Sequence, residues 1–130
     1  MRKPRFTSAE IEKLTGVKLE KPNVSKYRST KVKSSRGNFD SKKEFIRYLE
    51  LESLQKFGTI SQLKRQVRFE LVPEQVINGK TVRGVYYDSD FTYKRDGKFI
   101  VEDVKGMRTR VYAMKRKMMK QVHNIEILET

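Results

Sequence analysis

The sequence contains no cysteine and a single histidine, His123. The lack of cysteine excludes a disulfide framework and a thiolate zinc site, and one histidine cannot by itself build a histidine-rich metal site or a Ser-His-Asp triad. No segment approaches the ~20 apolar residues of a transmembrane helix, and no apolar stretch follows the N-terminal charges. The sequence therefore predicts a soluble, cytoplasmic protein in which carboxylates and lysines carry any chemistry.

Acidic residues are scarce relative to basic ones. Thirty Lys and Arg stand against sixteen Asp and Glu, which gives a net charge of +14 at pH 7. The electrostatic field of this net charge attracts polyanions and repels cationic partners, so nucleic acid is the first candidate partner. With 130 residues, of which 36% are apolar, the chain has room for one modest core, and part of its length must lie outside that core.

The basic residues are concentrated near the N-terminus. Residues 1–38 hold eleven Lys or Arg and three Glu, so they carry +8 of the +14. We expect these residues to form a basic arm and residues 39–130 to form one domain. The polar end of the arm, residues 25–38, is predicted to be mobile without a partner. A solvated tail is as consistent with this composition as an arm that contacts DNA.

Local patterns predict two helices. Residues 39–58 form the first, with Ser41 as N-cap, Glu44 at position N3 and Gly58 after its end. The stretch "TRVYAMKRKMMKQV", residues 109–122, has the spacing of a second helix. The residues at that spacing are Val111, Met114, Met118 and Val122, and we interpret Met114, Met118 and Met119 as packing residues.

Strand patterns occupy the sequence between these helices. "VRFELV" alternates apolar and polar residues, and the pair Asn78 and Gly79 predicts a hairpin turn into "TVRGVYYDSDFTY". Asp96 and Gly97 predict a second turn into "KFIVEDVK", and "IEILE" is a short last strand, while "TISQLKRQ" is interpreted as a connector. The order α-β-β-β-α-β predicts an α/β fold with a mixed, mostly antiparallel sheet flanked by two helices.

The stretch "FIVEDVKG", residues 99–106, places charged residues at the end of an apolar strand. Asp103 and Lys105 share a face because side chains two apart on a strand point the same way. The turn at Asp96 brings Asp90, on the neighbouring strand, within reach of Asp103. Two carboxylates this close repel each other unless a cation lies between them, and oxygen ligands of this kind suit Mg²⁺ or Mn²⁺.

The acidic pattern resembles that of the PD-(D/E)XK nuclease superfamily, whose common core is the restriction-endonuclease-like αβββαβ fold. In this pattern Glu44 lies on the first helix, Asp90 on the second core strand, and Asp103 and Lys105 form the (D/E)-x-K motif on the third. More narrowly, "FDSKKE", "YLEL", "RFEL", "NGK", "DFTY" and "VEDVKG" resemble a family of small phage and prophage proteins of largely unassigned function. The resemblance spans residues 27–128.

The resemblance implies a Mg²⁺- or Mn²⁺-dependent endodeoxyribonuclease, encoded by a phage or prophage and acting in the bacterial cytoplasm. Glu44, Asp90 and Asp103 are then metal ligands, the Val104 carbonyl a further ligand, and Lys105 the catalytic lysine. It also implies a dimeric Holliday-junction resolvase, or another nuclease selective for branched DNA, active in DNA recombination. The cations that we expect to contact DNA are Arg28, Lys31, Lys33, Arg36, Lys42, Lys43, Arg108, Arg110, Lys115, Arg116, Lys117 and Lys120.

Several alternatives remain open at this point. Asp88 competes with Asp90 as a ligand, and Glu102 with Asp103. Glu44 is fully explained as a capping-box residue, and Asp103 with Lys105 as an ion pair at the rim of a sheet. A noncatalytic DNA-binding or architectural protein on the same fold is therefore the main alternative function, and an RNA-associated accessory protein is a third.

Overall fold

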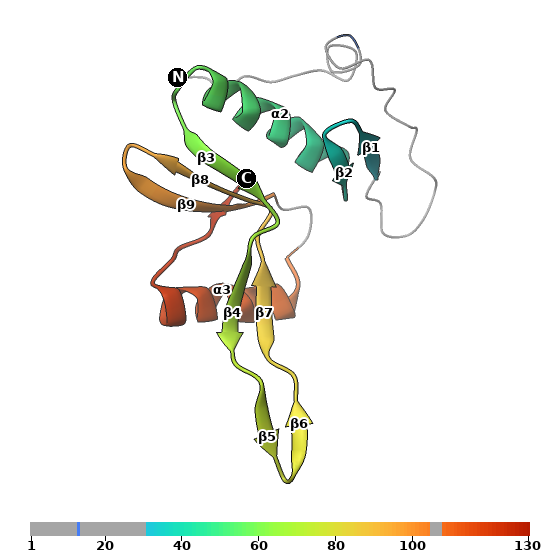
Figure 1. Cartoon of the computed structure of the whole chain (residues 1–130), viewed down its shortest axis with the longest axis vertical. Helices are drawn as coiled ribbons and strands as arrows, with labels where there is room; N and C mark the ends of the chain where they lie inside the picture. Colours follow the sequence, from blue (N-terminus) through green and yellow to red (C-terminus); the bar gives the residue numbers. More distant parts are fainter. Residues whose placement is uncertain (1–12, 14–30, 105–107) are drawn as a thin grey trace. The chain divides into compact units, whose positions relative to one another are not determined.

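We describe the protein from a computed structural model, which describes residue 13, residues 31–104 and residues 108–130 (Figure 1). Its described part is a mixed α/β structure with mostly antiparallel strands and two helices, so the predicted fold class is confirmed at this level. The chain divides into two compact units, residues 1–57 and residues 58–130, and each is described by itself. The predicted boundary between residues 38 and 39 lies within the first unit.

The first unit contains a hairpin followed by a helix. Strands β1 (Val32–Ser34) and β2 (Gly37–Phe39) pair in antiparallel fashion, and helix α2 (Lys42–Lys56) follows. Residues 32–38 belong to the stretch that we expected to be mobile, yet they form most of this hairpin. The reason is that the hairpin has its own apolar anchors, since it contributes two members of the buried cluster Val32, Phe39, Phe45 and Leu49.

Helix α2 has the ends that the sequence predicts. The Ser41 hydroxyl oxygen accepts a hydrogen bond from the backbone N–H of Glu44 at 3.1 Å, which satisfies one of the unpaired donors of the first turn. Phe57 is the C-cap, and Gly58 follows with φ of +81°, a backbone conformation in which glycine has no steric penalty.

The second unit is built on a mixed four-stranded sheet in the order β10-β9-β8-β3. Strand β10 (Leu128–Glu129) runs parallel to β9 (Lys98–Asp103), whereas β9 with β8 (Phe91–Arg95), and β8 with β3 (Ser61–Arg65), are antiparallel. The interpretation of "TISQLKRQ" as a connector is wrong, because it contains β3. The sequence of β3, "SQLKR", has one apolar residue and therefore no alternation to detect.

A ribbon of four short strands extends from this sheet (Figure 1). Strands β4 (Arg68–Val72) and β7 (Val85–Asp88) form its base, and β5 (Gln75–Ile77) and β6 (Lys80–Val82) form its tip. The predicted continuous return strand, residues 81–93, is therefore wrong, because it is divided among β6, β7 and β8. The change from ribbon to sheet occurs at Ser89, whose N–H and hydroxyl both donate to the Val67 carbonyl.

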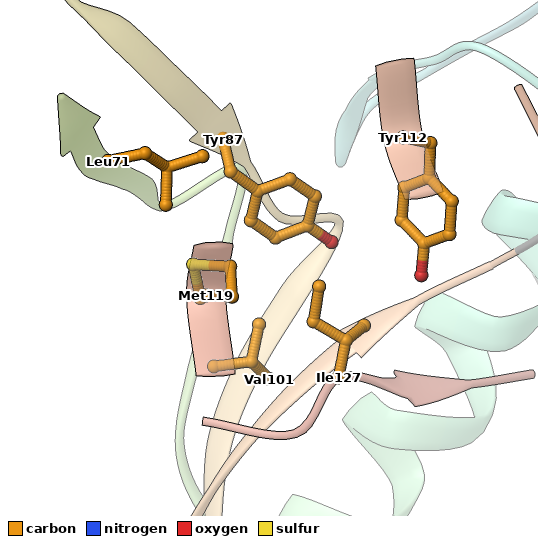
Figure 2. Packing of buried hydrophobic residues seen from close by; sticks show 6 residues of the cluster. All are labelled: Leu71, Tyr87, Val101, Tyr112, Met119 and Ile127. Carbon is orange, nitrogen blue, oxygen red and sulfur yellow. The ribbon is translucent and has the colours of Figure 1, made fainter. Parts of the chain in front are cut away.

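Helix α3 (Arg110–His123) completes the core of the second unit. Tyr112 and Met119 are its buried residues, and they pack with Leu71, Tyr87, Val101 and Ile127 (Figure 2). Of the three methionines interpreted as packing residues, Met119 is buried and Met118 is half-buried against this cluster, whereas Met114 is 52% exposed. Val111 and Val122, which share the helical spacing, are 57% and 52% exposed. Neither helix of the described residues is long and apolar enough to cross a membrane.

Candidate functional site

The register of the central strands brings Asp90 and Asp103 together. Phe91 lies opposite Glu102 in the antiparallel pair of β8 and β9. Continuing this register by one residue sets Asp90 opposite Asp103. Opposed residues of an antiparallel pair project from the same face with Cβ atoms about 5 Å apart. The two carboxylates therefore share one face of the sheet, at the end of β9 that leads to Lys105.

Hydrogen bonds from elsewhere in the second unit orient this pair. Asp90 Oδ2 accepts from the backbone N–H of Val104 at 2.7 Å, and Asp103 Oδ2 accepts from the Tyr87 hydroxyl at 2.6 Å. The backbone of both aspartates is also fixed, since Gln66 N–H donates to the Asp90 carbonyl and Thr130 N–H to the Asp103 carbonyl. Asp103 is buried and Asp90 is half-buried, so an approaching molecule reaches the pair from the side of Asp90.

The two core tyrosines experience the negative charge of this site. Burial and the hydrogen bond to Asp103, followed by the charge of that carboxylate, raise the pKa of Tyr87 far above its usual value. Burial, and then the charges of Asp103 and Glu129, raise the pKa of Tyr112 to about 12. The two rings lie 6.4 Å apart between centroids, and Figure 2 shows both among the side chains of the apolar cluster. Both hydroxyls therefore remain protonated at neutral pH, and Tyr87 acts as a donor to Asp103.

A third carboxylate, that of Glu129, lies on the strand next to Asp103. Glu129 is the partner of Asp103 in the parallel pair of β10 and β9, so it projects from the same face. Arg108 Nη2 lies 2.8 Å from Glu129 Oε2, and Arg116 Nε lies 3.3 Å from Glu129 Oε1. These two arginines, predicted to contact DNA, thus neutralise Glu129 beside the acidic pair.

The structure separates the competing acidic residues. Asp88 forms an exposed ion pair with Arg68, at 2.8 Å between Oδ1 and Nε, and the hydrogen bond and charge of Arg68 lower the pKa of Asp88. Glu102 lies on the opposite face of β9 from Asp103, where it accepts hydrogen bonds from the hydroxyls of Tyr93 and Thr130. Of the four carboxylates, Asp90 and Asp103 are therefore the two that face each other.

Lys105 and Glu44 are the other predicted catalytic residues. Lys105 lies outside the described residues, as does Arg28. Glu44 belongs to the first unit, where it is 4% exposed near the start of α2. Within the part of the chain that the structure describes, no group of three or more His, Cys, Asp or Glu side chains is arranged to hold a metal ion. Asp90 and Asp103 form an acidic pair within the second unit, and metal ligation by Glu44 and the role of Lys105 stay predictions.

Residues 24–128 match a protein family whose description is "Protein of unknown function (DUF1064)". The chain belongs to this family. The matched residues nearly coincide with the stretch 27–128 over which the sequence resembles a phage and prophage family, while the wider PD-(D/E)XK assignment stays a prediction. Neither the curated proteins nor the solved structures contain a significant match.

The cations that we expect to contact DNA differ in their surroundings in this DUF1064 protein. Arg36 pairs with Glu52 at 3.0 Å, and Lys120 lies 3.9 Å from Glu126. Lys42 and Lys115 are half-buried. The other described members of the set are exposed: Lys31, Lys33, Lys43, Arg108, Arg110, Arg116 and Lys117.

Sequence reasoning missed the DUF1064 residues that support the acidic pair: Tyr87, Tyr112, Glu129 and Thr130. Tyr87 packs in the apolar cluster, and its 2.6 Å hydrogen bond to Asp103 joins strands from the ribbon and from the sheet. Glu129 carried no local signal in the sequence. A parallel last strand beside β9 makes it a neighbour of Asp103 once the register is known.

Proposed function

We propose that this DUF1064 protein is a metal-dependent endodeoxyribonuclease that hydrolyses DNA phosphodiesters. The observation that carries the proposal is the acidic pair: the register of β8 and β9, continued by one residue, places Asp90 opposite Asp103, at the strand end that precedes Lys105. The net charge of +14 supports a polyanionic substrate. Selectivity for branched DNA, such as a Holliday junction, is the finer part of the proposal and rests on the sequence resemblance alone.

The chemistry of the pair fits a hard divalent cation. Mg²⁺ is commonly held by one or two carboxylates, with water and substrate phosphate completing its shell, and Mn²⁺ takes the same ligands. Asp90 and Asp103 would hold such an ion, and the resemblance adds Glu44 and the Val104 carbonyl. When bound, the metal supplies an activated water and neutralises charge on the phosphate.

The residues around the pair keep both carboxylates in fixed orientations. Tyr87 donates to one oxygen of Asp103, and the N–H of Val104 donates to one oxygen of Asp90. Both carboxylates therefore keep one oxygen in a hydrogen bond within the chain. Lys105 is proposed to stabilise the phosphate charge that grows during hydrolysis.

The noncatalytic DNA-binding protein is the second candidate, and the hydrogen bonds to the acidic pair bear on it. Burying Asp90 and Asp103 without a metal was expected to be costly. However, the Tyr87 hydroxyl and the Val104 N–H already compensate both carboxylates within the chain. The burial of the pair is therefore compatible with either function, and cleavage must be measured to distinguish them.

The test is a cleavage assay on labelled four-way junction, flap, single-stranded and linear duplex DNA with Mg²⁺, Mn²⁺ or EDTA. We expect cleavage that requires metal and falls by ~100-fold or more in Asp90→Asn, Asp103→Asn and Lys105→Ala, because each removes charge from the reacting centre. Glu44→Gln tests the ligand that the resemblance adds. DNA binding should survive in all four variants.

Asp88→Asn is the matched control, because Asp88 is an exposed carboxylate two residues from Asp90, paired with Arg68. It should cleave like the wild type. Metal-independent binding without cleavage on any substrate would refute the nuclease and support the DNA-binding protein. A preference for the four-way junction over the other substrates would support resolvase activity.

A further inference from the structure

The tip of the ribbon, formed by β5 and β6, contributes no residue to either buried apolar cluster of the described structure. All residues from 73 to 83 are exposed, and the tip extends beyond the base formed by β4 and β7 (Figure 1). It nevertheless carries apolar side chains, since Val76, Ile77 and Val82 are 69%, 47% and 40% exposed. Apolar side chains held in water on an extended element indicate a binding surface.

The tip is a defined hairpin. Asn78 and Gly79 form a tight two-residue turn, with φ of +53° and +73°. The register pairs Gln75 with Val82, Val76 with Thr81, and Ile77 with Lys80. Ile77 and Val82 therefore share one face with Gln75 and Lys80, while Val76 and Thr81 lie on the other. Each face combines apolar groups with hydrogen-bonding groups.

Charge and size decide which partner suits this hairpin. Residues 74–83 contain Glu74 against Lys80 and Arg83, a net charge of +1 on a chain of +14. A second copy would be repelled, and three aliphatic side chains offer far less than the ~800 Å² per partner of a stable protein interface. Duplex DNA fits both properties, because its major groove, about 12 Å wide, admits a two-stranded β-ribbon.

We propose that the β5–β6 hairpin enters the major groove of a duplex segment of the DNA substrate. Gln75, Asn78 and Thr81 offer donors and acceptors to base edges, and the aliphatic side chains contact thymine methyl groups. Lys80 and Arg83 contact flanking phosphates. The inference rests on the proposed function, which makes DNA the ligand. It adds the structural element that binds the duplex.

Dimethyl sulfate footprinting on a short labelled duplex tests the proposal, with the full chain in EDTA so that no cleavage interferes. The reagent methylates guanine N7 in the major groove and adenine N3 in the minor groove, so one reaction identifies the groove. We expect protection of guanine N7. Ile77→Ser/Val82→Ser should lose this protection, and Lys80→Ala/Arg83→Ala should lower the salt slope of binding by about two.

Lys94→Ala/Lys98→Ala is the control, because it removes the same charge from two exposed positions on the β8–β9 hairpin. It should retain the guanine footprint. Protection of adenine N3 instead, hairpin variants that bind and footprint like the wild type, or no binding to duplex would each overturn the proposal. Guanine protection without metal-dependent cleavage would support groove binding by the hairpin and refute the nuclease. Metal-dependent cleavage, together with hairpin variants that footprint like the wild type, would support the nuclease and refute groove binding by the hairpin.

Discussion

Tyr87 links the acidic pair to the apolar core of the second unit. Its ring packs in the cluster with Leu71 and Met119, and its hydroxyl donates to Asp103 at 2.6 Å. A hydrogen bond to a charged group contributes about 1.5–3 kcal/mol, and a buried carboxylate that loses its donor is destabilising. The residue therefore contributes both to the stability of the unit and to the orientation of a proposed ligand.

We predict that Tyr87→Phe lowers the free energy of unfolding at pH 7 by about 2 kcal/mol, measured by urea denaturation. The difference from the wild type should shrink above pH 10. The folded-state pKa of Tyr87 is raised above the usual 10.0. Its stabilising effect is therefore complete below pH 10 and is lost as the pH rises from there towards the folded-state pKa.

The matched control for this change is Tyr86→Phe, since Tyr86 precedes Tyr87 on β7 and projects from the opposite face. It removes a hydroxyl without touching Asp103 and should leave stability at pH 7 within about 0.5 kcal/mol. A constant difference between wild type and Tyr87→Phe from pH 7 to the alkaline limit would contradict the assigned role of the tyrosine.

At the scale of residues, the sequence predicted the acidic pair but not its supports. Asp90 and Asp103 could be matched because the tight turn at Asp96 and Gly97 sets the register of the two strands that it joins. Tyr87 and Glu129 depend on how the ribbon and the last strand meet the sheet. Those contacts are set by tertiary packing, and a single sequence carries no local signal for them.

At the scale of elements, the predictions were correct where the signal was local. Ser41 and Gly58 mark the ends of α2, and both tight turns form where the sequence places them. Helical spacing alone did not separate the buried from the exposed residues of α3, because the apolar residues of that helix lie on two sides. Packing against the sheet selected Tyr112 and Met119, and this choice depends on the partner surface rather than on helical spacing.

The ribbon depends on one close approach at Gly84. A Cβ atom added there would lie 2.7 Å from the Val72 carbonyl oxygen and 2.9 Å from the Tyr86 hydroxyl. Gly84→Ala must therefore displace backbone at the point where β6 continues into β7. We expect a loss of about 1–3 kcal/mol in the free energy of unfolding, measured by urea denaturation, as for other overpacked sites.

Gly79→Asn is the control for this substitution. Nothing lies within 4 Å of a Cβ at Gly79, and asparagine tolerates the positive φ of this position better than other residues do. The Asn variant should therefore lose less stability than Gly84→Ala. Equal losses in the two variants would show that backbone conformation, rather than the contact with Val72, determines the effect.

At the scale of the whole molecule, several arginines of the described residues are already paired with acids. Arg36, Arg47, Arg68, Arg108 and Arg116 each form an ion pair with a carboxylate. Residues 1–30, in contrast, hold eight Lys or Arg against three Glu, which is +5 of the +14. If DNA is the partner, this segment supplies a large share of the charge available to phosphates.

Removal of residues 1–30 should therefore weaken DNA binding and flatten its salt dependence. Each phosphate contact contributes ~0.9 to the slope of log K against log salt, so the loss of several contacts lowers the slope by several units. Fluorescence anisotropy between about 50 and 200 mM salt measures both quantities. A full-length variant with the eight Lys and Arg of this segment replaced by Gln should behave like the truncation, because charge rather than length is removed. Wild-type affinity and slope in both proteins would refute a DNA-contacting role for the segment, and the contacts would then have to come from cations after residue 30.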